Sequence, residues 1–226
     1  MKKKIICIIP ARKNSKRLKG KNYKMFFKKP LVYWTLKFST KLKNVDKIIF
    51  SSDSHELLNI AKPFKKIKRF LRPKKFATDG ALMKDVVLNV LNKNDKKFFS
   101  GILLLQPTTP YRNLKKFNKY LSKFNKKNDN YYSVSSKIKS NHKCYIKNKK
   151  LYFRKVGRTF FQTGSLILVS MKSFLKSNSF NINNSKPVIS NTLYENFDID
   201  YEKNFNDSLN FFKTKKICLN YFKALN

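Results

Sequence analysis

The sequence predicts an α/β fold in which a wound, mostly parallel sheet is flanked by helices. Short apolar runs alternate with helix-like segments, and the first run, residues 5–9, stops at Pro10. A loop crowded with cations and with amide and hydroxyl donors follows directly. Since proline cannot donate to a sheet ladder, the strand must end there. Ligands of such sheets bind at the carboxyl ends of the strands, so this loop is the first candidate for a binding site.

Local patterns place the individual elements along the chain. The strand-like runs are residues 4–9, 47–51, 101–105, 131–135 and 165–169. Apolar residues recur at helical spacing in residues 31–41, 55–62, 80–93, 114–125 and 202–213. Asp79, directly before Gly80, is a candidate N-cap of the third helix. Residues 136–162 break the alternation with polar connectors and short apolar runs.

Length and composition fit a single domain that spans residues 1–226. With 226 residues and 41% hydrophobic content, the chain can bury a sizeable core. No segment approaches the length of a membrane span. Cys7, Cys144 and Cys218 form neither a C-x-x-C pair nor an even set, so we expect reduced thiols in a cytoplasmic protein.

The charge of the chain is extreme, with 52 basic residues against 12 acidic ones and a formal net charge of +40. Charge alone would favour a nucleic-acid-binding protein. However, the basic residues are mostly lysine and are spread along nearly the whole chain, and no RNP motif, zinc-finger spacing or long basic helix is present. We therefore expect only nonspecific adhesion to nucleic acid, together with faster encounter with anionic substrates.

The loop after Pro10 has the residue types that a triphosphate requires. Arg12 can hold a phosphate through a planar fork of donors, while Lys16 and Lys21 supply compact charges. Asn14 and Ser15 add neutral donors. Neither a Walker signature nor a G-x-G-x-x-G fingerprint occurs in the chain, which disfavours P-loop and Rossmann cofactor sites. The alternative is that a lysine-rich chain shows a lysine-rich, solvated loop by composition alone.

A second cluster of functional residue types lies near the end of the chain, at Asp198 and Asp200. In an extended segment these two carboxylates lie on one face, where both could ligate a hard cation such as Mg²⁺. The alternative is that Asp200 caps the helix that follows. A bound cation would neutralise charge that builds on a phosphate and a departing pyrophosphate.

Several blocks of the sequence, including the cationic loop and the two late aspartates, resemble in order those of the CMP-N-acylneuraminate cytidylyltransferases. These enzymes join CTP to sialic acid and related nonulosonic acids. The opening signature is Ala11-Arg12-x-x-Ser15-Lys16-x-x-x-x-Lys21-Asn22. The similar blocks that follow are Lys29-Pro30-Leu31, residues 48–54, Leu71-Arg72-Pro73, residues 77–79, residues 104–112 and Phe197-Asp198-Ile199-Asp200. The resemblance covers about residues 4 to 212.

This resemblance implies a nucleotide-diphospho-sugar transferase-like fold with a small extension, about residues 136–162, for dimerisation and the sugar side. It implies nucleotide contacts for Ala11 and Asn22, a place near the cytosine for Arg72 and one at the sugar for Gln106. Arg12, Lys16 and Lys21 are expected to be the catalytic cations. It also favours Asp198 and Asp200 as Mg²⁺ ligands, and it implies a homodimer that takes CTP and a nonulosonic acid.

One block departs from the family pattern, which commonly has Asn-Gly-Ala in the strand that lines the sugar pocket. Here the strand reads Gln162-Thr163-Gly164-Ser165, so Thr163 and Gly164 are the candidate sugar-binding residues. Replacing the amide by a hydroxyl could change the acceptor that the enzyme prefers.

The predicted reaction is attack of the acceptor's anomeric hydroxyl on the α-phosphorus of CTP, with no evident general base. Three alternatives stay open: an enzyme like CMP-Kdo synthetase or another sugar nucleotidyltransferase, an inactive relative that only binds, and a basic nucleic-acid-binding protein.

Overall fold

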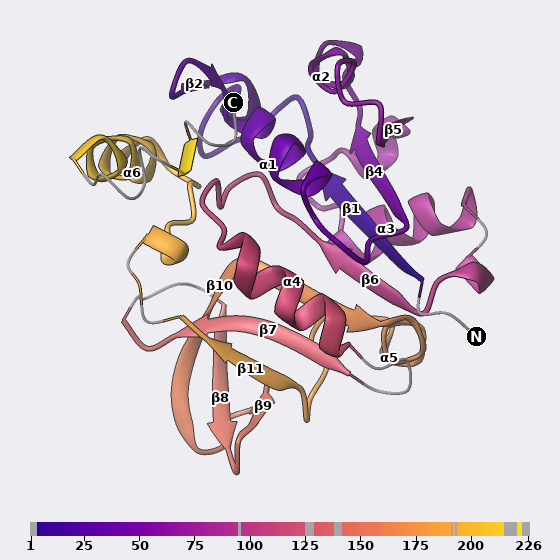
Figure 1. The fold of residues 1–226 in the computed structure, drawn as a ribbon, viewed down its shortest axis with the longest axis vertical. Coiled ribbons are helices and arrows are strands. Elements are labelled where there is room, and N and C mark those ends of the chain that lie inside the picture. The colour runs from indigo at the N-terminus through magenta and orange to yellow at the C-terminus, as the bar shows by residue number, and fades with distance from the viewer. Residues whose placement is uncertain are drawn as a thin grey trace.

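The structure is a computed structural model, and it describes residues 4–94, 96–124, 129–137, 142–190, 192, 194–214 and 221–222. One large sheet runs through the molecule, with helices packed on both faces (Figure 1). A two-stranded ribbon of β2 (Met25–Phe26) and β3 (Lys29–Pro30) lies apart from it. None of the described helices combines the length and apolar character needed to cross a lipid bilayer.

The main path of the sheet has the order β11-β7-β10-β6-β1-β4-β5. β1 is paired in parallel with β4 and β6, and β4 in parallel with β5. β10 runs antiparallel to both β6 and β7, and β11 runs parallel to β7. The strands are β1 (Ile5–Pro10), β4 (Lys47–Ser52), β5 (Ile67–Leu71), β6 (Gly101–Leu104), β7 (Asn130–Ser135), β10 (Arg158–Ser170) and β11 (Lys186–Ile189). The predicted wound, mostly parallel sheet is therefore confirmed.

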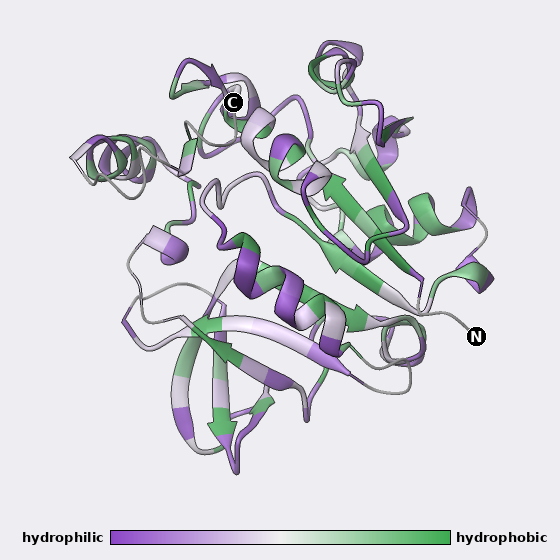
Figure 2. Cartoon of the chain, in the orientation of Figure 1, coloured by the Kyte–Doolittle hydropathy of each residue, from purple (hydrophilic) through white to green (hydrophobic). Residues whose placement is uncertain are grey.

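The helices cover both faces of the sheet because successive residues of β1 point to opposite sides. Cys7 and Ile9 pack in one core with α1 (Leu31–Thr40), α2 (His55–Ile60) and α4 (Leu114–Lys123). Ile6 and Ile8 pack in the other core with α3 (Met83–Asn92) and α5 (Met171–Ser177). Figure 2 shows these central strands as apolar and the loops and outer helix faces as hydrophilic. The apolar run of β1 is thus buried on both sides, as the sequence predicted.

A third core joins α6 (Glu202–Thr214) to the start of α1, and it is largely aromatic. Phe26 and Phe212 lie edge to face with ring centroids 5.9 Å apart, and Phe222 packs against both. The buried indole nitrogen of Trp34 donates to the carbonyl of Phe26 at 2.6 Å. This packing brings the C-terminal part of the chain beside the loop that follows β1.

The five predicted strands and five predicted helices are all present, with bounds that shift by a few residues except at β10. Ser54 and Asn113 cap α2 and α4 by accepting from backbone N–H groups of the first turn. The predicted cap at Asp79 is wrong. α3 begins at Met83, its N-cap position is Leu82 without a side-chain hydrogen bond, and the Asp79 carboxylate pairs with two cations instead.

Residues 136–162, expected to be an irregular extension, hold β8 (Lys143–Lys147), β9 (Lys150–Tyr152) and the first part of β10. β8 pairs with β10 and with β9, and the turn at Asn148 and Lys149 has φ of 49° and 59°, as a tight hairpin requires. This hairpin projects from the sheet at the bottom of Figure 1. Cys7 and Cys144 are buried free thiols, and Cys218 lies outside the described residues.

Short segments complete the chain. Four 3-10 turns occur among the described residues, namely η1 (Lys21–Tyr23), η2 (Lys74–Phe76), η3 (Lys96–Phe98) and η4 (Tyr194–Asn196). Of these, η1 lies between the loop after β1 and the β2–β3 ribbon, and it carries one of the predicted catalytic cations.

Candidate active site

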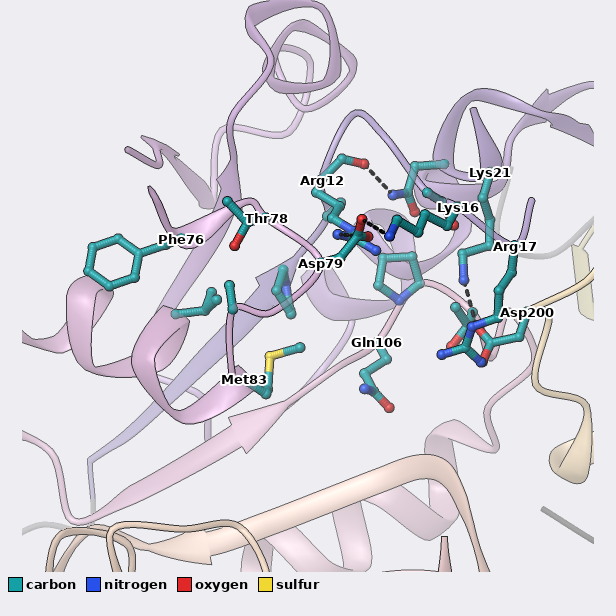
Figure 3. A pocket seen from close by; sticks show the side chains of 18 of the residues that line it. Arg12, Lys16, Arg17, Lys21, Phe76, Thr78, Asp79, Met83, Gln106 and Asp200 are labelled. Atoms are coloured by element: carbon teal, nitrogen blue, oxygen red, sulfur yellow. Dashed lines mark hydrogen bonds and ion pairs between the residues drawn. The ribbon is translucent and has the colours of Figure 1, made fainter. Parts of the chain in front are cut away.

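A pocket of about 480 Å³ opens at the carboxyl ends of β1, β5 and β6, a volume in the range of small-molecule sites. Figure 3 shows two groups of paired charges in it, with Phe76, Thr78 and Met83 toward the opposite end. The lining residues that carry functional side chains are Arg12, Ser15, Lys16, Arg17, Lys21, Asn22, Arg72, Asp79, Gln106, Thr108, His142, Asp198 and Asp200. The cationic loop and the late carboxylates therefore face one cavity.

The loop after β1 is fixed by hydrogen bonds that begin where the strand ends. The N–H of Ala11 donates to the carbonyl of Ser51 at 2.9 Å, and the N–H of Lys13 donates to Oδ1 of Asp53 at 2.9 Å. The buried amide of Asn22 donates to the carbonyl of Arg12 at 2.9 Å. Asn22 thus closes the loop from inside and also lines the pocket.

Asp79 neutralises two of the predicted phosphate-binding cations. Its Oδ1 lies 2.7 Å from Nη1 of Arg12, and its Oδ2 lies 3.1 Å from Nζ of Lys16. The hydrogen bond from Lys16, and then that from Arg12, hold the pKa of the Asp79 carboxyl below its ordinary value. The cations of this loop therefore already hold an anion, which comes from the segment before α3.

Asp200 neutralises the other pair of cations in the same way. Its Oδ1 lies 2.7 Å from Nζ of Lys21, and its Oδ2 lies 2.6 Å from Nη1 of Arg17. Partial burial acts to raise the pKa of Asp200, but the charge of Lys21 and then that of Arg17 lower it overall. The sequence predicted Lys21 and missed Arg17. These contacts do not support the alternative in which Asp200 caps α6, because its carboxylate is held by the two cations.

Asp198 is the more deeply buried of the two carboxylates. Burial and then the charge of Asp200 raise its pKa, while a hydrogen bond with Thr108 acts in the opposite direction. Its Oδ1 has no hydrogen-bond partner among the residues that the structure describes. Between the two aspartates, Ile199 is fully buried in the aromatic core and its N–H donates to the carbonyl of Thr108 at 2.8 Å. The expected alternation therefore directs both carboxylates toward the pocket.

Asp198 has a carboxylate oxygen open to a hard cation, whereas both oxygens of Asp200 are paired with cations. An unpartnered, buried carboxylate oxygen such as Oδ1 of Asp198 needs a donor or an ion. Among the described residues no group of three or more His, Cys, Asp or Glu side chains could hold a metal. The pair would therefore need substrate oxygens or water to complete a coordination shell, which is the usual arrangement for Mg²⁺ at phosphate sites.

Arg72 follows β5 and is another lining residue of the pocket. It is only 5% exposed, and within the described part of the chain its Nε and Nη2 have no hydrogen-bond partner. Nη2 lies 3.9 Å from Oδ1 of Asp53, close enough for an ion pair but too far for a hydrogen bond. Burial lowers the pKa of Arg72, with Asp53 acting in the opposite direction. Two buried donors of Arg72 are thus left without a hydrogen bond among the described residues.

Arg112 is buried completely and fixes the loop that carries Gln106. Its guanidinium donates to the carbonyl of Gln106, to Oγ1 of Thr109 at 2.7 Å, to Oγ1 of Thr35 at 2.9 Å and to the carbonyl of Ser165 at 3.2 Å. Burial lowers the pKa of Arg112 to about 10. This one side chain ties the loop to α1 and β10, a role that no local pattern in the sequence indicates.

Three predicted site residues are not among the described residues that line the pocket. Asn14 is exposed on the loop. Thr163 is 1% exposed, and its hydroxyl donates to Oγ of Ser133 at 2.7 Å inside the sheet. Gly164 has φ of +71°, and a Cβ there would meet Oε1 of Gln106 at 3.0 Å. A direct sugar contact by the Thr163 side chain therefore has no support in this geometry, because the β10 backbone turns the hydroxyl inward.

The fold and the pocket define a nucleotidyltransferase-like α/β domain. The fold matches CMP:2-keto-3-deoxy-manno-octonic acid synthetase complexed with CTP, with TM-score 0.69 and 13% identity over 93% of this chain and 98% of that one. It also matches 4-diphosphocytidyl-2C-methyl-D-erythritol synthase from Anaerococcus prevotii, with TM-score 0.63 and 15% identity over 93% and 96% of the two chains. At these identities the likeness shows the fold alone.

The chain belongs to the cytidylyltransferase family, whose sequence model matches residues 6–222. It is 26% identical over 212 residues to the CMP-N,N'-diacetyllegionaminic acid synthase of Legionella pneumophila, which covers 87% of this chain and 91% of the relative. It is 36% identical over 112 residues to the N-acylneuraminate cytidylyltransferase of Escherichia coli, which covers 50% of this chain but only 26% of that relative. The resemblance found in the sequence is confirmed.

Proposed function

We propose that the protein transfers the cytidylyl group of CTP to a nonulosonic acid and gives a CMP-sugar and pyrophosphate. The observation that carries this proposal is that one pocket is lined by the cationic loop, by Arg72 and by the two late aspartates. The names of the relatives support the acceptor class, since they refer to legionaminic, acylneuraminic and pseudaminic acids.

The nucleotide is assigned to the part of the pocket that holds the cations and Arg72. Arg12, Lys16 and Lys21 bind the triphosphate, and Ser15 adds a neutral donor at the same loop. Arg72 donates Nε and Nη2 to acceptor atoms of the cytosine, which gives hydrogen bonds to two buried donors that have none among the described residues. Binding to the triphosphate requires Arg12 and Lys16 to exchange the carboxylate of Asp79 for phosphate oxygens.

Asp198 and Asp200 are the residues that would hold Mg²⁺, together with phosphate oxygens of the nucleotide. When bound, the ion would neutralise charge on the reacting phosphates. Lys21 remains beside Asp200 and orients its carboxylate, so the cationic loop and the carboxylate pair act on the same phosphates.

The acceptor is assigned to the part of the pocket beside Gln106 and His142. Arg112 holds the Gln106 backbone, and Gly164 leaves the room that the Gln106 side chain occupies. The anomeric hydroxyl oxygen attacks the α-phosphorus in line, the bond from that phosphorus to its leaving oxygen breaks, and pyrophosphate departs with the electron pair. The hydroxyl proton passes to solvent, and we assign no residue as general base.

The assembly and setting of the enzyme are part of the same proposal. The β8–β9 hairpin and the first part of β10 project from the sheet and are proposed to contact a second copy in a homodimer (Figure 1). We place the enzyme in the cytoplasm, where CTP is available. We propose that its product is the activated sugar from which surface glycans are built.

The test is a pyrophosphate-release assay with CTP, Mg²⁺ and a panel of acceptors: legionaminic, acylneuraminic and pseudaminic acids, and 3-deoxy-manno-octulosonic acid. Release with one nonulosonic acid supports the proposal and names the acceptor. Release with the octulosonic acid alone would overturn the acceptor class. No release with any acceptor, combined with tight and salt-sensitive RNA binding, would overturn the proposal as a whole.

A further inference from the structure

Arg17 contacts the carboxylate that the proposed function assigns to a metal ion. Its Nη1 lies 2.6 Å from Oδ2 of Asp200, while Nζ of Lys21 lies 2.7 Å from Oδ1 (Figure 3). Both oxygens of Asp200 are therefore held by cations. Each oxygen could still ligate an ion through its second lone pair, but the positive charges of Arg17 and Lys21 oppose the approach of a divalent ion to Asp200.

The two cations differ in how easily they can leave. The Lys21 side chain is 11% exposed and starts from the η1 turn. Separating it from Asp200 would leave its ammonium group buried without its counter-ion. The Arg17 side chain is 52% exposed, and its guanidinium lies over the ring of Tyr201 at 5.5 Å from the centroid. Arg17 can therefore leave Asp200 while it remains solvated, and Tyr201 gives it a surface to lie on.

The two aspartates then offer an incoming ion two oxygens that differ in their present partners. Among the described residues Oδ1 of Asp198 is buried without a hydrogen-bond partner, and Oδ2 of Asp200 is held by Arg17, the more exposed of the two cations. As an exposed ion pair, the contact between Arg17 and Asp200 contributes little to stability. The contact matters for ligand binding instead, because Arg17 itself lines the pocket.

We propose that Arg17 is a further phosphate-binding residue that acts as the counter-ion of Asp200 until the nucleotide arrives. Arg17 yields Oδ2 of Asp200 to the divalent ion and turns its guanidinium to oxygens of the ion-bound phosphates. This inference rests on the proposed function, because it needs the carboxylate pair to bind an ion and the loop to bind phosphates. The planar fork of Arg17 suits such oxygens.

The proposal predicts that Arg17→Ala raises the affinity for a metal ion and lowers the affinity for metal-bound pyrophosphate. Without the competing guanidinium, the nucleotide-free protein should bind Mn²⁺ more tightly by a few-fold, the size expected of an exposed ion pair. Without the phosphate contact, the same variant should bind Mg²⁺–pyrophosphate about tenfold more weakly or worse. Arg17→Lys, which keeps the charge and loses the fork, should fall between the wild type and Arg17→Ala in pyrophosphate affinity.

Lys19→Ala is the matched control, because Lys19 is an exposed cation of the same loop that does not line the pocket. Mn²⁺ binding is measured by electron paramagnetic resonance and pyrophosphate binding by calorimetry, both in 0.15 M salt to screen distant charges. Tighter Mn²⁺ binding together with weaker pyrophosphate binding in Arg17→Ala, with neither change in Lys19→Ala, supports the proposal. Equal behaviour of the two variants, or a loss of Mn²⁺ affinity in Arg17→Ala, overturns it.

The failure of this inference can be told apart from failure of the proposed function. If the wild type releases pyrophosphate with a nonulosonic acid but Arg17→Ala behaves like Lys19→Ala in both titrations, the enzyme is as proposed and the role of Arg17 is wrong. If the wild type binds neither Mn²⁺ nor Mg²⁺–pyrophosphate, the pocket itself is misassigned.

Discussion

Nζ of Lys21 lies 2.7 Å from Oδ1 of Asp200, although 179 positions separate the two residues in the chain. Two features bring them together. Lys21 begins the η1 turn after the cationic loop, and the segment before α6 is tied to the Gln106 loop by the hydrogen bond from Ile199 to Thr108. The aromatic core around Phe26 and Phe212 then fixes α6 against α1. This contact joins the two halves of the proposed active site.

Asp200→Asn and Lys21→Ala should each lower kcat by about 10²–10³-fold, because each removes charge stabilisation of the reacting phosphates. Glu202→Gln is the matched control, since Glu202 pairs with Lys24 at 2.7 Å and does not line the pocket. The measurement is steady-state pyrophosphate release with the preferred acceptor. Near-normal turnover in either site variant would contradict the assigned roles.

Asp79→Asn should increase the affinity of the protein for inorganic pyrophosphate without metal by about two- to tenfold, the size of two exposed ion pairs. The reason is that Asp79 occupies Arg12 and Lys16 in the empty pocket. Asp207→Asn, on the exposed face of α6, makes the same change in net charge elsewhere. Calorimetry on both variants checks the prediction, and equal affinities would show that Asp79 does not compete with phosphate.

Arg72→Met should weaken CTP binding by about 10- to 100-fold and leave tripolyphosphate binding unchanged, because Arg72 is assigned to the base. This assignment rests on Nε and Nη2 of Arg72, two buried donors without a hydrogen bond among the described residues. Arg69→Met serves as the control for charge, because Arg69 is an exposed arginine of β5, the strand that Arg72 follows. A parallel loss of CTP and tripolyphosphate affinity would instead place Arg72 at the phosphates.

Asp198→Asn should raise Tm at pH 7, by about 2–4 °C for each kcal/mol gained. Burial raises the pKa of Asp198 in the folded state, so the charged carboxylate opposes folding at neutral pH. This penalty disappears as the pH falls through the raised pKa, so the difference between variant and wild type should shrink on acidification. Scanning calorimetry at pH 7 and at stepwise lower pH tests this, and a wild type as stable as the variant at pH 7 would refute it.

The main features of the fold could be predicted because they depend on local signals. The apolar run that stops at Pro10, the helical spacing of residues such as Val86 and Val90, and the turns after each strand are all visible in the sequence. The missed elements lack such signals. β5 is half exposed and carries two cations, and α5 has only seven residues, too few for a clear period.

The site could be predicted in its residue types but not in its pairings. The alternation of Asp198 and Asp200 and the crowding of cations after β1 named six lining residues: Arg12, Ser15, Lys16, Lys21, Asp198 and Asp200. The family resemblance added Ala11, Asn22, Arg72 and Gln106. That Asp79 holds Arg12, that Arg112 fixes Gln106 and that Thr163 turns inward depends on contacts between distant segments. No spacing in a single sequence encodes those contacts.

The most direct test of the central claim is ³¹P NMR of the reaction with CTP, Mg²⁺ and the preferred nonulosonic acid. The claim predicts one new phosphodiester resonance and an equal amount of pyrophosphate, with neither formed when the sugar is omitted. Inorganic phosphate as the product, or pyrophosphate formed at the same rate without any acceptor, would contradict it.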